Sequence, residues 1–205
     1  MWDGIENAGC GVHDYDDSYW VNLTTGIRCS CSGVVKYRNY VSFGADGVES
    51  ILRSGFDIKN YGTIEILISK HNLGKDVNKC SIVGGPSRYD GYGICDNNGV
   101  IVDTKDDEGG RGIRLVLDVT TLYTYTKNTN ASTREIFKNG SLDDGVFAAV
   151  DRRFGRAQGN AIASGAYGSI ASYFDAYSVR IYSHVFTPDE ISANYAVDKA
   201  RFNLP

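Results

Sequence analysis

The chain has 205 residues, of which 42% are hydrophobic and 22% are charged, and its formal net charge is −4 at pH 7. This composition is ordinary for a globular protein and excludes a largely disordered chain. The length suits a single all-β domain spanning residues 1–205. The acidic balance argues against a nucleic-acid partner, because phosphate binding requires a concentrated basic surface. No apolar run reaches the length of a membrane span, so we expect no membrane insertion.

The first half of the chain shows the two-residue periodicity of half-buried strands. Residues 34–43 and 63–70 both place hydrophobic side chains at alternate positions. The expected apolar faces are Val35, Tyr37, Val41 and Phe43 in the first run and Ile64, Ile66 and Ile68 in the second. An antiparallel sheet with one buried and one solvated face gives this pattern. We therefore expect Glu65 to be an outward polar residue of a half-exposed strand.

The middle of the chain continues the pattern at short spacing. In residues 113–119, the hydrophobic side chains again alternate with polar ones, as Ile113, Leu115, Leu117 and Val119. Further strands are expected at residues 79–83, 99–103, 121–127 and 133–138. The last of these runs into Asn139-Gly140, a strong hairpin signal because both residues tolerate positive φ. Many short strands between Gly- and Asp-rich turns predict a sandwich or a barrel.

The C-terminal part predicts one more strand and one helix. Tyr177, Val179 and Ile181 alternate and form an expected inward face. In the following segment, Thr187 is the expected N-cap and Glu190 its capping-box partner, with a proline at the first helical position. A hydrophobic side chain at 191 and a tyrosine at 195 lie four residues apart, so one stripe of this helix can dock on the sandwich.

Several of these segments resemble a known family. Residues 175–183 (DAYSVRIYS) followed by 186–191 (FTPDEI) resemble the closing strand and helix start of laminin-G-like domains in the concanavalin A-like lectin/glucanase superfamily. Residues 63–66 (TIEI) and 138–142 (KNGSL) are similar to a strand and a hairpin of that family. The opening residues 2–7 and closing residues 194–202 resemble a subgroup found in gut bacteria and their phages or prophages. Phe174 departs from the pattern, where a small residue is expected.

The resemblance implies a concanavalin A-like jelly roll, a β-sandwich of two antiparallel sheets with one short C-terminal helix. It also raises the possibility of glucanase activity. Retaining glycoside hydrolysis needs two carboxylates roughly 5 Å apart, and the glucanase pattern resembles Glu-x-Asp-x-x-Glu. Here Glu65 is followed by Leu67 and Lys70 at the partner positions. We therefore expect no enzymatic activity and keep a glycoside hydrolase as a remote alternative.

Neither the cysteines nor the acidic loops point to a metal or a cofactor. The odd count of five cysteines leaves at least one thiol unpaired, and no second pair or histidine cluster completes a zinc site. The cysteines are Cys10, Cys29, Cys31, Cys80 and Cys95. The acidic loops match no defined calcium-binding spacing. We expect no metal site and no cofactor, and we expect Trp20 to belong to the core.

A recognition function fits the fold best. Lectin sites pair an aromatic platform with polar groups, and four tyrosines are candidates. Tyr89 and Tyr92 lie in a Gly-rich loop, where binding residues often sit. Tyr123 and Tyr125 alternate on one strand and are candidates for a shared exposed face. The alternative is that these tyrosines pack in the core or along its rim.

The expected function is therefore non-catalytic recognition or attachment, with lectin-like carbohydrate binding on a cell or phage surface. A structural phage virion component, such as a decoration, fibre or tail module that mediates subunit contacts, is the alternative. The expected partners are a glycan or protein surface and, in the second case, other virion subunits. The corresponding locations are a phage virion, or a bacterial cell surface as part of a larger protein.

Overall fold

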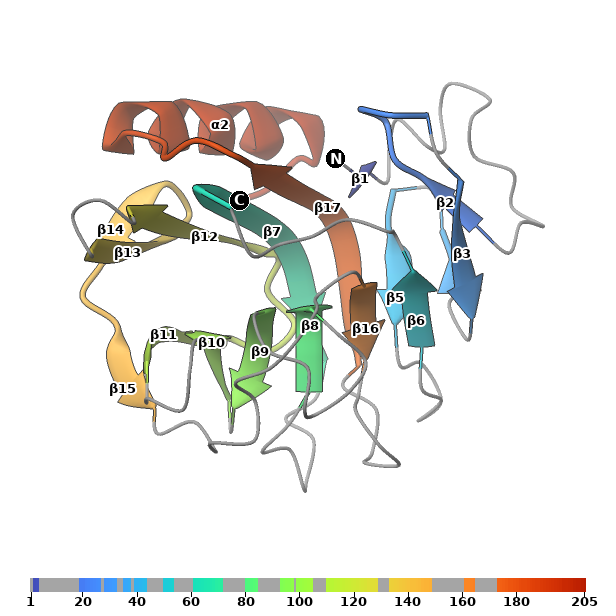
Figure 1. Cartoon of the computed structure of the whole chain (residues 1–205), viewed down its shortest axis with the longest axis horizontal. Helices are drawn as coiled ribbons and strands as arrows, with labels where there is room; N and C mark the ends of the chain where they lie inside the picture. The colour runs from blue at the N-terminus through green and yellow to red at the C-terminus, as the bar shows by residue number, and fades with distance from the viewer. Residues whose placement is uncertain are drawn as a thin grey trace.

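The computed structural model describes two antiparallel β-sheets and one helix (Figure 1). The described residues are 2–3, 19–26, 28–32, 35–37, 39–43, 50–53, 61–71, 80–84, 93–97, 99–104, 110–128, 133–148, 161–164 and 173–205. The architecture confirms the expected all-β sandwich with a short C-terminal helix. Among the described residues, no helix combines the length and apolar character that crossing a membrane requires.

The first sheet contains eight strands in the order β14-β13-β12-β7-β17-β5-β4, with β1 also paired to β17. Its strands are β1 (Trp2–Asp3), β4 (Val35–Lys36), β5 (Val41–Phe43), β7 (Thr63–Lys70), β12 (Thr121–Asn128), β13 (Thr133–Lys138), β14 (Ser141–Asp143) and β17 (Phe174–Tyr182). The centre of this sheet joins β7 from the first third of the chain to β17 near its end. Long-range pairing of this kind is typical of a sandwich.

The second sheet contains nine strands in the order β15-β11-β10-β9-β8-β16-β6-β3-β2. Its strands are β2 (Tyr19–Val21), β3 (Arg28–Ser32), β6 (Ser50–Arg53), β8 (Cys80–Gly84), β9 (Gly93–Asn97), β10 (Val100–Thr104), β11 (Gly110–Arg114), β15 (Val146–Ala148) and β16 (Ala161–Ser164). Every strand pair in both sheets is antiparallel.

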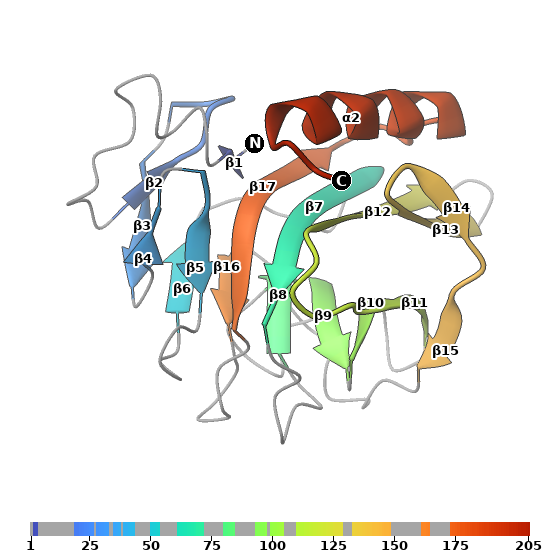
Figure 2. The ribbon, with the colours of Figure 1, turned by 180° about the vertical axis from the view of Figure 1, so that it is seen from behind.

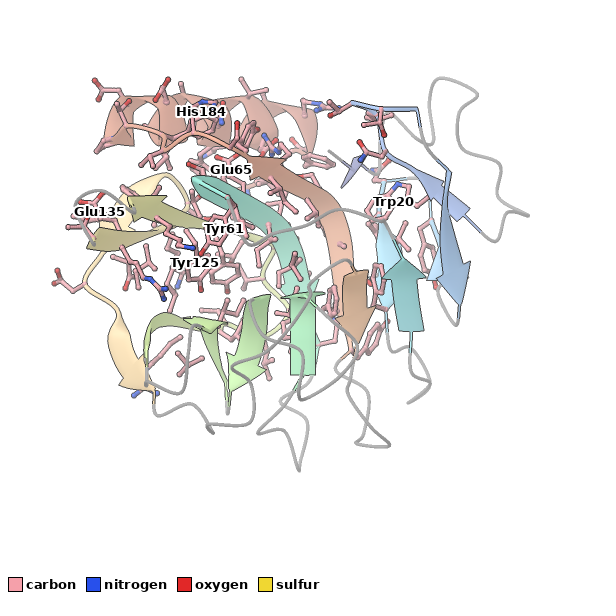
Figure 3. The ribbon with its side chains drawn as sticks, in the orientation of Figure 1. Trp20, Tyr61, Glu65, Tyr125, Glu135 and His184 are labelled. Atoms are coloured by element: carbon pink, nitrogen blue, oxygen red, sulfur yellow. The ribbon has the colours of Figure 1, made fainter. Side chains whose placement is uncertain are left out.

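The main hydrophobic core draws on alternate residues of the two sheets. Trp20 is fully buried at one end of it, as expected from the sequence (Figure 3). Phe174, the residue that departs from the family pattern, is also fully buried, and its ring stacks on Phe43 with centroids 5.1 Å apart. The other large contributors are Val41, Ile64, Ile66, Ile68, Ile82, Val83, Ile101, Ile113, Tyr123, Tyr125, Ile136 and Val179.

The helix α2 (Pro188–Arg201) lies along one end of the first sheet, on the face opposite the main core (Figure 2). Thr187 is its N-cap, and its hydroxyl and the Glu190 side chain form the expected capping box. Ile191 is buried and joins Phe137 and Phe186 in a second, smaller hydrophobic cluster between the helix and the sheet. Both the capping signal and the docking residue predicted from the sequence are confirmed.

The helix changes the environment of β7, which is buried at all eight positions. Ile64, Ile66 and Ile68 face the core as predicted, but Glu65 on the other side is also completely buried. The expectation that Glu65 faces solvent on a half-exposed strand is therefore wrong. Alternation along a strand separates the two faces of a sheet, but it does not show whether another element covers the second face.

Two predicted strands are interrupted by turns. The strand predicted over residues 34–43 is replaced by β4 and β5, because the chain reverses where the Tyr37 amide donates to the Tyr40 carbonyl at 2.9 Å. Residues 113–119 do not form one strand either, because β11 ends at Arg114 and the chain then crosses from the second sheet to the first. Leu117 and Val119 are 37% and 40% exposed on this crossing. The predicted Asn139-Gly140 hairpin is confirmed, with φ angles of 51° and 77°.

Candidate functional site

Two of the four candidate tyrosines belong to the core. Tyr123 and Tyr125 are each 1% exposed, and the Tyr125 hydroxyl donates to the Ile101 carbonyl at 2.6 Å (Figure 3). They pair with Ile66 and Ile64 of β7 and therefore point towards the second sheet. The prediction that they share an exposed face is wrong, and the alternative that they pack in the core is correct. Tyr89 and Tyr92 lie outside the described residues, so the prediction for them stands as made.

A different set of aromatic side chains lies on the first sheet, near the C-terminal end of α2. The Tyr37 and Tyr40 rings stack with centroids 4.7 Å apart. The Tyr40 and Tyr177 ring centroids lie 5.2 Å apart, and the Tyr177 ring meets the Phe202 ring edge-on with centroids 5.6 Å apart. We call these four side chains the aromatic ladder. Its outer member, Tyr37, is 44% exposed, and the other three are partly buried.

The sequence pattern assigned Tyr37 and Tyr177 to inward faces, and both assignments are wrong. Tyr37 follows the end of β4 and enters the turn, so it no longer obeys the strand alternation. Tyr177 occupies a register shift between Ala176 and Ser178, where β17 has one residue more than β7. A bulge of this kind commonly redirects a side chain. Asn39 within the turn was a usable local signal for the reversal, whereas the bulge left no signal in the alternation.

A chain of hydrogen bonds runs beside the aromatic ladder. The Ser42 hydroxyl donates to Asp175 Oδ1. Asp175 Oδ2 lies 2.8 Å from His71 Nε2, and His71 Nδ1 lies 2.8 Å from Asp118 Oδ1. We call these four residues the polar row. Strand β17 positions Asp175 opposite Ser42 of β5, while His71 directly follows β7.

The polar row and the aromatic ladder are contiguous. The His71 ring lies 4.6 Å from the Tyr173 ring, measured between centroids, and both Tyr173 and Asp175 lie close enough to Tyr40 of the ladder to raise its pKa. On the other side, the Tyr177 side chain is hydrogen-bonded to the side chain of Thr120, which lies two residues after Asp118. Asp175 is 6% exposed, whereas the Asp118 side chain is 72% exposed. The combined surface therefore has a buried carboxylate beneath it and an exposed one at its margin.

Burial and neighbouring charges shift the pKa values of this surface. Burial lowers the pKa of His71, but its hydrogen bonds to Asp118 and Asp175 raise it more, so the net pKa is raised. Burial, followed by the nearby Asp175 carboxylate, raises the pKa of Tyr40. Burial is also the main cause of the raised pKa of Tyr177. The tyrosine hydroxyls therefore stay neutral at physiological pH and remain able to donate hydrogen bonds.

The polar row is not arranged as a nucleophilic triad. Such a triad requires a histidine nitrogen bonded to the nucleophilic hydroxyl, but the Ser42 hydroxyl bonds to Asp175 instead. Both His71 ring nitrogens are engaged by carboxylates. His71 therefore has no ring nitrogen left to remove a proton from a substrate.

A second group of charged residues is buried between α2 and the first sheet. Arg180 Nη2 contacts Asp198 Oδ2, and Arg180 Nη1 lies 3.4 Å from Glu65 Oε2. Asn194 Nδ2 donates to Glu65 Oε1 at 3.2 Å, and the Tyr182 hydroxyl donates to Glu65 Oε2 at 3.3 Å. Figure 3 shows Glu65 beneath the helix. These contacts attach α2 to the sheet.

The same contacts explain the titration behaviour of this buried group. Burial raises the pKa of Glu65 despite the opposing effect of Arg180. Burial and then the Glu65 carboxylate raise the pKa of Tyr182 to about 12. Because Glu65 is inaccessible and committed to these partners, it cannot contact a substrate. Within the part of the chain that the structure describes, no cluster of three His, Cys, Asp or Glu side chains suits a metal ion.

Comparisons with solved structures relate the fold to several binding domains. Neither the protein-family models nor the curated protein sequences gave a match. The botulinum neurotoxin serotype D binding domain superposes with a TM-score of 0.62 and 16% identity, over 91% of this chain and 51% of that chain. The binding domain of Paraclostridial Mosquitocidal Protein 1 gives 0.58 and 14%, over 92% and 51%.

A Trypanosoma rangeli sialidase, solved in complex with sialic acid, gives a TM-score of 0.64 and 15% identity. This match covers 91% of the present chain and 32% of the sialidase. The chain thus spans about half the length of the two binding domains and about a third of the sialidase. At these identities the likeness concerns the fold, and the chain has the β-sandwich fold that these proteins contain.

Proposed function

We propose that this chain is a non-catalytic recognition domain that binds carbohydrate through the aromatic ladder and the polar row beside it. The observation that carries the proposal is the partly exposed stack of Tyr37, Tyr40 and Tyr177 next to fixed polar side chains. We further propose that residues 1–205 act as one domain.

The chemistry of sugars supports this assignment. A pyranose ring presents an apolar C–H face and a rim of hydroxyl groups, so its binding site needs an aromatic surface and oriented polar groups. Tyrosine combines an apolar ring with a polar hydroxyl, and specific sites place a few polar groups beside apolar contacts to orient the ligand. The ladder supplies the rings, and Asp118 at its margin supplies an exposed oriented carboxylate.

The surroundings of the titratable residues support a non-catalytic role. His71 is bonded on both ring nitrogens, and Glu65 is buried under α2. The structural neighbours also include the binding domains of two toxins, the receptor-binding domain of a third, and a sialidase. Glycoside hydrolysis requires two carboxylates that reach the sugar, but of the two carboxylates beside the ladder only Asp118 is exposed, while Asp175 is buried with both oxygens bonded to Ser42 and His71.

The test is a glycan array with the full chain, followed by titration of each hit. Tyr37→Ala should weaken binding about two- to tenfold, the range expected for one aromatic contact. Leu142→Ala is the matched control, because Leu142 is also an exposed hydrophobic residue (64%) but lies on β14. Tyr89→Ala and Tyr92→Ala test the separate prediction for the Gly-rich loop.

The absence of any binder on a broad array would contradict the proposal. Binding that is lost in the Tyr89 and Tyr92 variants but unchanged in Tyr37→Ala would reject the aromatic ladder as the site. Light scattering on the purified chain tests the alternative of a virion subunit. A defined oligomer without any glycan ligand would favour that structural role.

A further inference from the structure

Asp118 is exposed but firmly held. Its side chain is 72% exposed, yet Oδ1 lies 2.8 Å from His71 Nδ1. Its backbone amide donates to the Lys70 carbonyl at 2.8 Å, and its φ of 57° falls in the left-handed region. A residue other than glycine in this region is uncommon and is maintained by surrounding contacts. The contacts to Lys70 and His71 supply that support, so the carboxylate has a defined position at the edge of the aromatic surface.

The hydrogen bonds of the polar row determine which groups it can offer to a ligand. Both nitrogens of His71 are occupied by carboxylates, and both oxygens of Asp175 are occupied by Ser42 and His71. Among the described residues, Asp118 uses only Oδ1. An ionised carboxylate only accepts hydrogen bonds. The polar row can therefore offer a ligand the second carboxylate oxygen of Asp118 as an acceptor. The ring nitrogens of His71 are already bonded within the row and offer no donor.

The charges at the end of the ladder beside the polar row also favour a hydrogen-bond donor over an anionic group of the ligand. Asp118 and Asp175 flank His71, so the three groups together carry a net negative charge even when the His71 ring is protonated. Arg201 brings a positive charge to the other end, where its guanidinium carbon lies 5.6 Å from the Phe202 ring centroid. An anionic ligand group next to Asp118 would meet a like charge and an acceptor that cannot pair with it.

We propose that Asp118 is a specificity-determining residue that selects hydrogen-bond-donating sugars, neutral or amino-substituted, against acidic sugars. The proposal rests on the proposed carbohydrate-binding function and adds the chemical class of the ligand. A hydroxyl or ammonium group of the ligand donates to the outer oxygen of Asp118 while a ring face lies on the aromatic ladder. The carboxylate of an acidic sugar is repelled from the same position.

The experiment compares paired neutral and sialylated oligosaccharides, such as lactose and sialyllactose, on the full chain by calorimetry or quantitative array. One charge pair about 6 Å apart at an effective dielectric of about 40–80 changes affinity about three- to tenfold. We therefore expect sialylated forms to bind about three- to tenfold more weakly at low salt. The difference should shrink in high salt, because exposed charges are screened.

Asp118→Asn tests the residue itself. Asparagine tolerates the left-handed backbone and keeps an oxygen for His71, so the fold and the His71 contact are retained. In this variant the discrimination between neutral and sialylated forms should disappear. Asp189→Asn is the control, because it removes the same charge from an exposed position in the first turn of α2 and should leave the discrimination unchanged.

The outcomes separate the two proposals. If sialylated sugars bind as well as or better than neutral ones, the selectivity proposal is overturned and carbohydrate binding stands. Discrimination that persists in Asp118→Asn also overturns it. If neither form of any pair binds, and the wider array shows no ligand, carbohydrate binding itself fails.

Discussion

Removing Arg180 should destabilise the protein strongly, because Arg180 is the cation between two fully buried carboxylates. The guanidinium contacts Asp198 on α2 and Glu65 on β7, and Nη2 also donates to the Ser178 hydroxyl at 3.1 Å. Both carboxylates are 0% exposed and Arg180 is 6% exposed. Substitution with leucine keeps much of the side-chain volume but leaves both carboxylates buried without the positive charge.

The expected cost is about 3–5 kcal/mol, the usual range for removing one partner of a buried ion pair. For a chain of this size, 1 kcal/mol corresponds to about 2–4 °C in Tm, so the melting temperature should fall by about 6–20 °C. The cost should also depend on pH. Without Arg180, the folded-state pKa of Glu65 rises further above its unfolded value. The destabilisation is then smallest below the unfolded pKa and grows as pH rises through the folded one.

Thermal and urea unfolding at pH 5 and pH 7, followed by circular dichroism, measure this effect. Arg114→Leu is the control, because Arg114 ends β11 and is exposed. Adding Asp198→Asn to Arg180→Leu should recover part of the lost stability by removing one buried charge. A loss below about 1 kcal/mol for Arg180→Leu, equal to that of Arg114→Leu, would refute the view that this ion cluster attaches α2.

Four other substitutions test three separate features. Gly140→Ala and Gly26→Ala both place a side chain at positive φ, at a cost of about 1–2 kcal/mol. Gly140→Ala should cost more in urea unfolding, because its Cβ would lie 3.0 Å from Tyr195 Cβ. Gly26→Ala is the control, since a Cβ at Gly26 would have nothing within 4 Å. Equal losses would contradict the close packing of the hairpin on α2. Thr187→Ala should cost about 1 kcal/mol by removing the N-cap, and no change in melting temperature would argue against it. Because the pKa of His71 is higher in the folded than in the unfolded state, His71 stabilises the fold fully at pH values below the unfolded-state pKa, and this contribution is lost as pH rises through the folded-state pKa. The free energy of unfolding of His71→Gln should therefore fall less between pH 6 and pH 8 than that of the wild type. An unchanged pH profile would reject the contribution.

Local signals in the sequence predicted local structure well. The Asn139-Gly140 turn and the capping box of Thr187 and Glu190 depend on residues within a few positions of one another, and both are present. The inward positions of β7 also follow from alternation, because the apolar side chains must face the core. These features need no knowledge of distant segments.

Features that depend on distant segments were not predictable in the same way. Glu65 pairs with Arg180 and, through it, with Asp198, but only the sheet topology and the docking of α2 bring the three together. The polar row likewise joins Ser42 and Asp175 across paired strands and reaches His71 at the end of a third. No spacing rule connects these positions. Alternation alone left the face of Tyr123 and Tyr125 open between an exposed platform and the core for a related reason, since a tyrosine suits both a buried and an exposed strand position.

The face of the first sheet that points away from the core is divided into two parts with different chemistry. Under α2, Glu65 and Arg180 are buried, and their charges are balanced by partners within the chain, so this part serves stability. On the rest of this face, Tyr37 and Asp118 remain substantially exposed although contacts hold them in place. Holding an exposed polar or aromatic side chain in one position adds little to the free energy of folding. It does lower the entropic cost of ordering that side chain when a ligand binds. That contrast is the physical reason to place recognition on the part of the face that α2 leaves uncovered.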